Sequence, residues 1–583
     1  MARPSPAASI AGAHSRRLAL FAVLAFALAL RLANLWWMSR LPLVTEQVRW
    51  PEGDMAFYYA WSGKILDGDV LGRDTPHPYT QWMRAIAPQG TWERWWGGRQ
   101  VFHNAPLYPY LLAGFRLVFG DGFRAIAIAQ LAIGLAGVAV AFAIADRVFG
   151  RVAAVAAGLT ASLFGPMLLY ESFALRDGLA ATTALGVVWA LVRAEGGRGW
   201  WLAGLSFGVA LLARENMVAF LPFVAGWLAW VHRGRRALLA ASAGKFAAGV
   251  VLALLPLVAR NVAVGVRPWA LSPQGIQALA LGHVADGSPA LLEVTPDVAR
   301  VLTAADGSLI DVLRQIWSTY AGDWRALAAH EAMRLAAIVS SFEGMDNVSW
   351  YYLRDRSPIL DLTLPFHVVL ALGVVGLIVE RGSGARQGPL RLFLAFSVLS
   401  LMVTPVLGRY RLPIALVLAI YCGAAIAWAA SQLARRRWLP VAAACVTAIA
   451  IVGASQRMLA RLETRMRYRS VDFGISAQRF FERGDRAEAI AELRSGLRAA
   501  YRGPDQTTLP KGFDLLARAY AIHAYQSGRA DEAAGELSDL ASDFPADPGI
   551  QELLGLLYRD GLGRSDEAER HLAEARRLRS SSP

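Results

Sequence analysis

Charged residues are scarce in this sequence, and cysteine is scarcer still. Charged side chains make up 18% of the 583 residues and hydrophobic ones 55%, whereas soluble globular chains carry about a quarter charged residues. This composition excludes a disordered, collagen-like or ordinary cytosolic protein and indicates a polytopic membrane protein. The two cysteines, Cys422 and Cys445, lie in apolar runs, which excludes a disulfide framework and a thiolate metal site.

Common nucleotide and metal motifs are missing as well. The sequence has no Walker loop and no G-x-G-x-x-G that follows a strand, which disfavours nucleotide-sugar or ATP chemistry at a cytosolic site. It has no H-x-x-E-H pattern and no paired histidines with supporting carboxylates. The sequence therefore identifies no cofactor, and it leaves a divalent metal open.

About eleven hydrophobic runs predict membrane-spanning helices. The first run follows Arg16 and Arg17 and contains Arg31, and we interpret it as an uncleaved first span. The predicted fold class is an all-α polytopic membrane helix bundle with a C-terminal helical repeat domain. The predicted spans are 18–38, 123–145, 152–170, 178–192, 200–213, 217–231, 243–259, 363–379, 392–407, 412–433 and 438–454.

The arginines predict the orientation of the bundle. If segment 1–17 is cytoplasmic, the inner segments hold sixteen arginines against three acidic residues, and the short outer turns hold four against three. Cytoplasmic loops retain positive charge, so the net charge of +14 reflects topology and not nucleic-acid binding. Segments 39–122 and 262–360 and the tail from 456 are then outside the cytoplasm. We expect a bacterial inner-membrane protein with a periplasmic or extracellular C-terminal domain.

The tail, residues 456–583, has the composition of a soluble helical domain. The pattern G-x-x-x-E-A occurs three times, beginning at Gly484, Gly528 and Gly563, with spacings of 44 and 35 residues. The tail therefore resembles a tetratricopeptide array of about three repeats, whose period is about 34 residues. A generic helical hairpin domain is the alternative. Neither contains catalytic residues, so we expect a packing or binding module with a protein partner.

The first outer segment, between the first two spans, contains acidic and aromatic residues. Asp54 is followed by Tyr58 and Tyr59, and His103-Asn104-Ala105-Pro106-Leu107 comes later. Tryptophans at the membrane surface are often interfacial anchors, but they can also stack on a sugar ring or an isoprenoid chain. Both interpretations stay open for the tryptophans of this segment: Trp50, Trp61, Trp82, Trp92, Trp95 and Trp96.

On these residues the sequence resembles the GT-C membrane glycosyltransferases, in particular family 39, which includes protein mannosyltransferases and lipid A aminoarabinose transferases. Members carry an acidic residue in a D-x-x-x-Y-like context after the first span, as Asp54 and Tyr58 do. They also carry a K-P-P-L-type segment that opens an amphipathic helix ending near F-G. The stretch 103–120 matches this frame, except that His103 or Asn104 replaces the lysine.

Later segments extend the resemblance over roughly residues 18–455. The family's second acidic residue has its counterpart in the turn that contains Glu171, Arg176 and Asp177. An R-N pair ends the seventh span, and a segment like R-Y-x-L-P opens a late span. These two segments contain Arg260, Asn261, Arg409, Tyr410 and Arg411.

The resemblance implies that a sugar moves from a polyprenyl phosphate carrier to a lipid, protein or glycan acceptor on the outer side, in a single inverting displacement. Asp54 would be the base and Asp177 would assist it. An acidic residue near lipid usually marks a site, and a carboxylate can accept the acceptor's proton. Outer arginines suit a phosphate. The predicted substrate-binding residues are Tyr58, His103, Asn104, Glu171, Arg176, Arg214, Arg260, Asn261, Arg409, Tyr410 and Arg411.

Simpler interpretations stay open for several of these residues. Asp54 could cap a helix, Asp177 could pair with Arg176, and Glu215 could pair with Arg214. The alternative functions are an O-antigen ligase or polymerase and a non-catalytic membrane scaffold whose repeats recruit envelope partners. The sequence does not identify the sugar, the acceptor, the carrier length or the partner of the repeats.

Overall fold

The described part of the chain is helical. The computed structural model describes residues 6–74, 76–194, 199–273, 275–380 and 386–581. These ranges contain no β-strand, and one isolated bridge pairs Phe164 with Leu364. The predicted all-α class is confirmed. The start of the N-terminal segment 1–17, and parts of the two inner turns near 195 and 381, lie outside the described residues.

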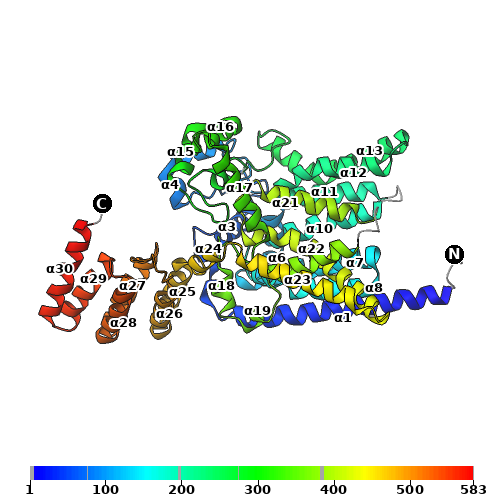
Figure 1. The fold of residues 1–583 in the computed structure, drawn as a ribbon. Coiled ribbons are helices and arrows are strands. Elements are labelled where there is room, and N and C mark those ends of the chain that lie inside the picture. The colour runs from blue at the N-terminus through cyan, green and yellow to red at the C-terminus, as the bar shows by residue number, and fades with distance from the viewer. Residues whose placement is uncertain (1–5, 75, 195–198, 274, 381–385, 582–583) are drawn as a thin grey trace. The chain divides into compact units, whose positions relative to one another are not determined.

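Apolar helices form a multi-pass bundle (Figure 1). Within the described residues, six helices are long and apolar enough to cross a membrane, and shorter apolar helices accompany them. Each of the eleven predicted spans overlaps with one of these helices. The long helices are α1 (Pro6–Met38), α7 (Phe123–Phe149), α10 (Asp177–Ala194), α13 (Arg236–Ala263), α22 (Leu412–Ala434) and α23 (Trp438–Arg457). The shorter ones are α6 (Leu107–Phe119), α8 (Arg151–Leu163), α11 (Trp200–Ala213), α12 (Leu221–Val231), α20 (Phe366–Val379) and α21 (Gly388–Leu401).

The third predicted span, 152–170, is two helices and not one. α8 ends at Leu163, and α9 (Gly165–Tyr170) begins with Pro166 in its first turn. Proline lacks an N–H and clashes with the preceding turn, so a continuous helix is interrupted there. Leu364 supplies substitute hydrogen bonds: its N–H donates to the Leu163 carbonyl over 2.8 Å, and its carbonyl accepts from Gly165 over 3.0 Å.

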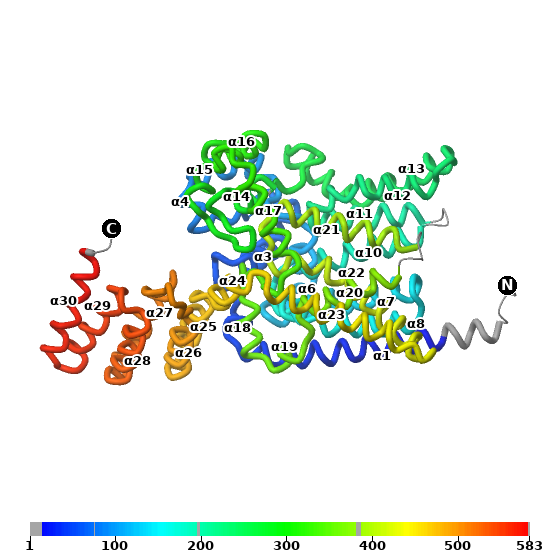
Figure 2. Tube along the Cα trace, viewed as in Figure 1, coloured from blue at the N-terminus to red at the C-terminus, as the bar shows by residue number. Residues whose placement is uncertain are grey.

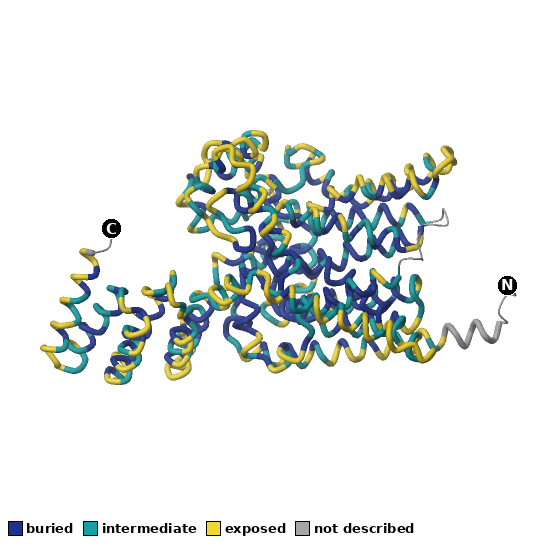
Figure 3. The backbone as a smooth tube through the Cα atoms, viewed as in Figure 1, coloured by how far each residue is buried: buried dark blue, intermediate teal, exposed yellow. Residues whose placement is uncertain are grey.

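Glycines allow close packing between α11 and α13. A Cβ on Gly204 would lie 1.9 Å from the carbonyl oxygen of Phe246, and a Cβ on Gly249 would lie 2.1 Å from that of Trp201. Small residues at helix crossings are the usual means of packing in membranes. Figure 3 shows buried residues concentrated inside the bundle.

Short helices fill the two outer segments, and several tryptophans form their core. Trp92 and Trp96 of the first segment pack in one cluster with Val298, Val301 and Val312 of the second. Neither tryptophan is more than 2% exposed, so both are packing residues. The first segment contains α2 (Pro42–Thr45), η1 (Gln47–Arg49), α3 (Asp54–Leu66), α4 (Gln81–Ile86) and α5 (Gln89–Trp95). The second contains α14 (Gly275–His283), α15 (Pro296–Ala305), α16 (Leu309–Thr319), α17 (Trp324–Val339), α18 (Trp350–Arg354) and α19 (Pro358–Asp361).

A second compact unit contains the tail and two pieces of the outer segments, Ser39–Glu46 and Val348–Arg356. Within it, Arg483 Nε donates to Glu46 over 2.7 Å, and Arg356 Nη2 donates to Glu492 over 2.8 Å. The sequence boundary at 456 does not include these two pieces.

The tail forms three successive helical hairpins (Figure 2). Gly484, Gly528 and Gly563 have positive φ angles of 89°, 72° and 66° and follow the first helix of each hairpin, as predicted for a helix-ending glycine. Their assignment as tetratricopeptide repeats stays a prediction. The helices are α24 (Ala460–Arg465), α25 (Ser470–Arg483), α26 (Arg486–Ala499), α27 (Phe513–Gln526), α28 (Ala530–Asp543), α29 (Pro548–Leu556), η4 (Leu557–Gly561) and α30 (Ser565–Ser581).

Candidate active site

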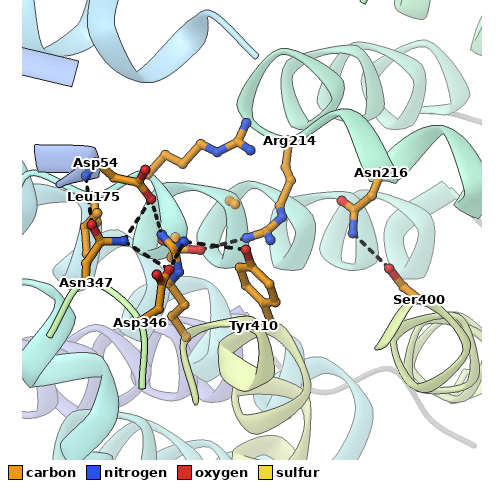
Figure 4. Close-up of polar contacts among 12 residues, drawn as sticks. Asp54, Leu175, Arg214, Asn216, Asp346, Asn347, Ser400 and Tyr410 are labelled. Atoms are coloured by element: carbon orange, nitrogen blue, oxygen red, sulfur yellow. Dashed lines mark hydrogen bonds and ion pairs between the residues drawn. The ribbon is translucent and has the colours of Figure 1, made fainter. Parts of the chain in front are cut away.

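Asp54 opens α3 and is held by Asn347 of the second outer segment (Figure 4). Gly53 is the N-cap, and the Asp54 side chain makes no capping bond, which excludes the helix-cap interpretation. The Asp54 N–H donates to Asn347 Oδ1 over 2.7 Å, and Asn347 Nδ2 donates to Asp54 Oδ2 over 2.9 Å. These bonds fix both the backbone and the carboxylate of Asp54.

Arg409 lies among three carboxylates. Its Nη1 donates to Asp54 Oδ2 over 2.8 Å and to Asp177 Oδ2 over 3.2 Å, and its Nη2 donates to Asp346. Arg409 is 8% exposed and Asp177 is 2% exposed. Buried charges are costly unless they are paired, so the guanidinium group stabilises the convergence of these carboxylates.

Asp177 and Asp54 differ in how far their oxygens are engaged. Arg214 Nη1 donates to Asp177 Oδ1 over 2.7 Å, so arginines bind both oxygens of Asp177. Asp54 is 35% exposed, and within the described residues its Oδ1 has no protein hydrogen-bond partner. Of these two carboxylates, Asp54 is the one that has an oxygen without a protein partner among the described residues.

Arg214 and Arg176 each form an ion pair with an acidic residue that is not adjacent in the sequence. The Arg214 guanidinium lies 4.4 Å from the centre of the Tyr410 ring. Arg176 donates to both oxygens of Glu215, over 2.7 and 3.0 Å. Burial alone would lower the pKa of Arg176, but the facing Glu215 carboxylate outweighs it and raises that pKa overall. The predicted alternatives, Asp177 with Arg176 and Glu215 with Arg214, are not the pairs in the structure.

Arg411 holds the segment that leads to the site. It is 1% exposed, donates to the carbonyls of Ser340 and Phe342 over 2.8 and 2.7 Å, and pairs with Glu343 at 2.7 Å. Arg411 and Arg409 share the turn η3 (Gly408–Arg411). The hydrogen-bonding groups of Arg411 are therefore engaged by other residues of the chain. Arg411 positions the backbone just before Asp346.

Tyr58 is buried beside these charges. Its ring centre lies 5.2 Å from that of Tyr108 in an edge-on arrangement, and the Tyr58 side chain is 1% exposed. Burial raises the pKa of the Tyr58 hydroxyl well above its ordinary value, although Arg176 opposes this shift. The hydroxyl therefore stays protonated and can only donate or accept a hydrogen bond.

His103 and Asn104 are buried in the outer core, 3% and 4% exposed. The His103 ring centre lies 4.4 Å from that of Trp96. Burial, with the nearby charges of His77 and Arg176, holds the pKa of His103 well below its ordinary value. A neutral imidazole cannot supply the positive charge of the lysine that the family carries here.

Glu171 is bound to the first span. Arg31 of α1 donates to it through Nη2 over 2.9 Å, and the two side chains are 2% and 5% exposed. A Cβ on Gly134 would lie 2.2 Å from Glu171 Oε1, so the glycine makes room for the pair. Among the described residues Glu171 forms its ion pair with Arg31 and not with Arg409. This pair explains why an arginine lies within an apolar span.

Arg260 and Asn261 bind loop carbonyls. Arg260 donates to Leu71 over 2.7 Å and to Gly72 over 2.6 Å. Asn261 Nδ2 donates to the carbonyls of Pro268 and Ala270, each over 3.1 Å. Within the described residues, neither side chain has a hydrogen bond or ion pair to Arg409 or to the three aspartates around it.

Asp346 and Asn347 are absent from the sequence prediction. They follow α17 in the stretch 342–347, and Asp-Asn two residues after a glycine is typical of an ordinary turn. Their place in the site depends on Asp54, 293 positions earlier for Asn347. The only signal in the sequence was a short acidic stretch in an outer segment.

A pocket of about 50 Å³ with both polar and apolar lining residues lies next to Arg214. Asn216 donates to Ser400 over 2.9 Å at its edge (Figure 4). The polar lining consists of Arg214, Asn216, Ser397, Ser400, Thr404 and Tyr410. The apolar lining consists of Ala180, Ala184, Met217, Phe393, Phe396, Leu401 and Pro413.

The described residues do not fit a metal ion. They contain no group of three or more His, Cys, Asp or Glu side chains arranged to hold one. The three aspartates nearest to such a group surround the Arg409 guanidinium, which provides the positive charge at their centre.

Comparison with known proteins supports the sequence resemblance. The family described as dolichyl-phosphate-mannose-protein mannosyltransferase matches residues 103–260. This segment contains Asp177 and Arg214 and ends at Arg260, the first residue of the R-N pair. The predicted resemblance to the GT-C glycosyltransferases is confirmed. No curated protein sequence matches the chain.

Solved structures of membrane glycosyltransferases are similar to this chain. The oligosaccharyltransferase AglB from Archaeoglobus fulgidus, in complex with an inhibitory peptide and a dolichol-phosphate, is 14% identical with a TM-score of 0.40; the match covers 83% of this chain and 58% of that one. The same archaeal enzyme with zinc and sulfate is 16% identical with a TM-score of 0.41, covering 74% and 52%. ArnT from Cupriavidus metallidurans, bound to undecaprenyl phosphate, is 15% identical with a TM-score of 0.33, covering 71% and 78%.

Proposed function

Because residues 103–260 match the family described as dolichyl-phosphate-mannose-protein mannosyltransferase, we propose that the chain is a GT-C membrane glycosyltransferase that transfers a sugar from a polyprenyl-phosphate donor to an acceptor on the outer side of the membrane. One observation carries this proposal. Asp54 is anchored through Oδ2 by Arg409 and Asn347, while Oδ1 has no protein hydrogen-bond partner among the described residues. An oriented carboxylate with one open oxygen is what a general base requires.

The acceptor step uses that open oxygen. As the acceptor hydroxyl attacks the anomeric carbon of the sugar, its proton passes to Asp54 Oδ1. The bond between the anomeric carbon and the phosphate oxygen breaks at the same time, and its electron pair leaves with the lipid phosphate. Attack on one face and departure from the other invert the configuration at the anomeric carbon.

The leaving phosphate needs a cation, and Arg214 suits this role. Only its Nη1 is engaged by a protein oxygen within the described residues, at Asp177, so its other N–H groups can donate to phosphate oxygens. Arg214 also lines a pocket to which Phe393 and Phe396 contribute. A cation next to apolar side chains suits the chemistry of a phosphate that carries a prenyl chain.

The test is transfer by washed membranes from a radiolabelled polyprenyl-phosphate sugar, compared with a nucleotide sugar. We expect product from the lipid-linked donor only, and its loss in Asp54→Asn. The matched control is Asp67→Asn, an exposed aspartate at the opposite end of α3, which should keep wild-type transfer. Product from the nucleotide sugar alone, or none from either donor, contradicts the proposal; the second result favours the scaffold alternative.

A further inference from the structure

A second cleft, of about 1080 Å³, lies between the two outer segments. Residues 73–74 and 96–101 form one side of it, and residues 265–273 form the other. None of the residues that surround Arg409 lines it. Its charged and aromatic lining consists of Arg73, Asp74, Trp96, Arg99, Arg267 and Trp269.

The R-N pair at the end of α13 sets both walls of this cleft. Arg260 binds the carbonyls of Leu71 and Gly72, directly before Arg73. Asn261 binds those of Pro268 and Ala270, on either side of Trp269. Two neighbouring side chains therefore fix the backbone of both walls, which makes the cleft a built feature of the fold and gives the R-N pair a positioning role.

The cleft carries excess positive charge. Its one lining carboxylate, Asp74, is already bound by Arg99 at 2.8 Å and by Lys64. Among the described residues Arg73 and Arg267 have no carboxylate partner, and both are exposed. Two arginines facing one open space favour an anion with several oxygens, since guanidinium groups bind phosphate and carboxylate through paired N–H donors.

Trp269 adds an exposed apolar surface to the cleft. Its side chain is 76% exposed, so its indole face is open to a ligand. Trp96 also lines the cleft, but it is 2% exposed and packs in the outer core. The apolar face of a tryptophan suits the C–H face of a sugar ring.

We propose that this cleft binds an anionic saccharide, a sugar ring that carries a phosphate or carboxylate group. This binding site is separate from the residues around Arg409 and goes beyond the proposed function. Arg73 and Arg267 bind the anion, and Trp269 packs against the ring.

The experiment measures binding and not turnover. Saturation transfer from the purified full-length protein to sugar-ring protons is recorded with glucose 6-phosphate, glucuronate and glucose, each alone and in competition with inorganic phosphate. We expect binding of glucose 6-phosphate or glucuronate and at least tenfold weaker binding of glucose. Which of the two binds more tightly separates a phosphate from a carboxylate ligand. Equal affinity for glucose, or inorganic phosphate that competes as tightly as the sugar phosphate, overturns the proposal.

Variants locate the site. Arg73→Ala, Arg267→Ala and Trp269→Ala change exposed side chains, so all three proteins should fold. Loss of one charge-assisted contact should weaken the affinity by about tenfold in each arginine variant. The matched controls Arg325→Ala and Trp324→Ala alter an exposed arginine and a 64% exposed tryptophan outside the cleft and should bind as the wild type does. Unchanged affinity in both arginine variants overturns the proposal.

Failure here is distinguishable from failure of the proposed function. Asp54→Asn should bind the anionic saccharide normally while it loses transfer. Absence of transfer from any lipid donor would contradict the proposed function, whereas absence of saccharide binding would contradict the cleft assignment alone.

Discussion

Arg409 donates a hydrogen bond to Asp54 over 2.8 Å, although the two residues lie 355 positions apart in the chain. The same nitrogen also reaches Asp177 at the start of α10. One side chain therefore joins the first outer segment, an outer turn and a late span. The geometry of the proposed base depends on this arginine as much as on Asp54.

Arg409→Ala should destabilise the protein. It would leave three carboxylates close together in a poorly solvated place, and removing one partner of a buried ion pair typically costs about 3–5 kcal/mol. Arg409→Lys keeps the charge but loses the fork, so it should fold and lose about tenfold or more in turnover. Apparent melting temperature in detergent and transfer rate are the measurements. The control is Arg435→Ala, an exposed arginine at the C-terminal end of α22, the helix that follows η3; an Arg409→Ala protein as stable as this control would contradict the account.

Asn347→Ala should lower turnover more than donor binding. Asn347 orients Asp54 through two hydrogen bonds, and a hydrogen bond to a charged group is worth about 1.5–3 kcal/mol. We expect a loss of about tenfold or more in transfer with donor affinity retained. The control is Gln89→Ala, which changes an exposed residue at the start of α5 in the first outer segment. Wild-type transfer by Asn347→Ala would show that Asp54 needs no such anchor.

The repeats should lie on the same side of the membrane as Asp54. Within the second unit, α25 and α26 bind Glu46 and Arg356, which belong to the outer segments that also contain Asp54 and Asn347. A reporter that is active only in the cytoplasm should therefore be silent when fused after Pro583. Activity of this fusion, with silence of a second fusion placed after Asp121, would put the tail on the opposite face.

Stability should fall in mild acid, in part through His103. Because the folded pKa of His103 is well below the ordinary value, the unfolded chain binds a proton first as the pH drops through about 6.5. The stabilisation is thus complete above pH 6.5 and declines below it, by about 1.4 kcal/mol at pH 5.5 for one such group. His103→Asn should show a shallower decline of apparent melting temperature between pH 7.5 and 5.5. The control is His14→Asn, which changes an exposed histidine. If the melting temperature falls equally steeply with pH in the two variants, His103 does not contribute to the acid sensitivity.

The sequence predicted the membrane bundle well because each hydrophobic run carries its own signal. The break at Pro166 was missed because the backbone that satisfies it belongs to Leu364, nearly two hundred positions later. Asp54 and Asp177 were predicted from the family resemblance and from their places near predicted membrane boundaries. The structure brings both into contact with Arg409, and their catalytic roles stay a prediction.

Other site assignments required the fold. Arg260 has the residue type and place expected of a phosphate ligand, yet it binds the carbonyls of Leu71 and Gly72. Backbone acceptors carry no mark in a sequence, so spacing alone could not reveal that contact. Asp346 was missed because the residue that binds it, Arg409, lies 63 positions later in the turn η3.

The central claim is that Asp54 takes the acceptor's proton. The most direct measurement is single-turnover transfer from a labelled polyprenyl-phosphate sugar by Asp54→Asn, with donor affinity measured on the same preparation. A general base typically contributes about a hundred- to ten-thousandfold, and loss of a group that acts in the transition state lowers turnover more than affinity. The account predicts at least about a hundredfold slower transfer with donor affinity unchanged. Near-normal transfer by Asp54→Asn would contradict it.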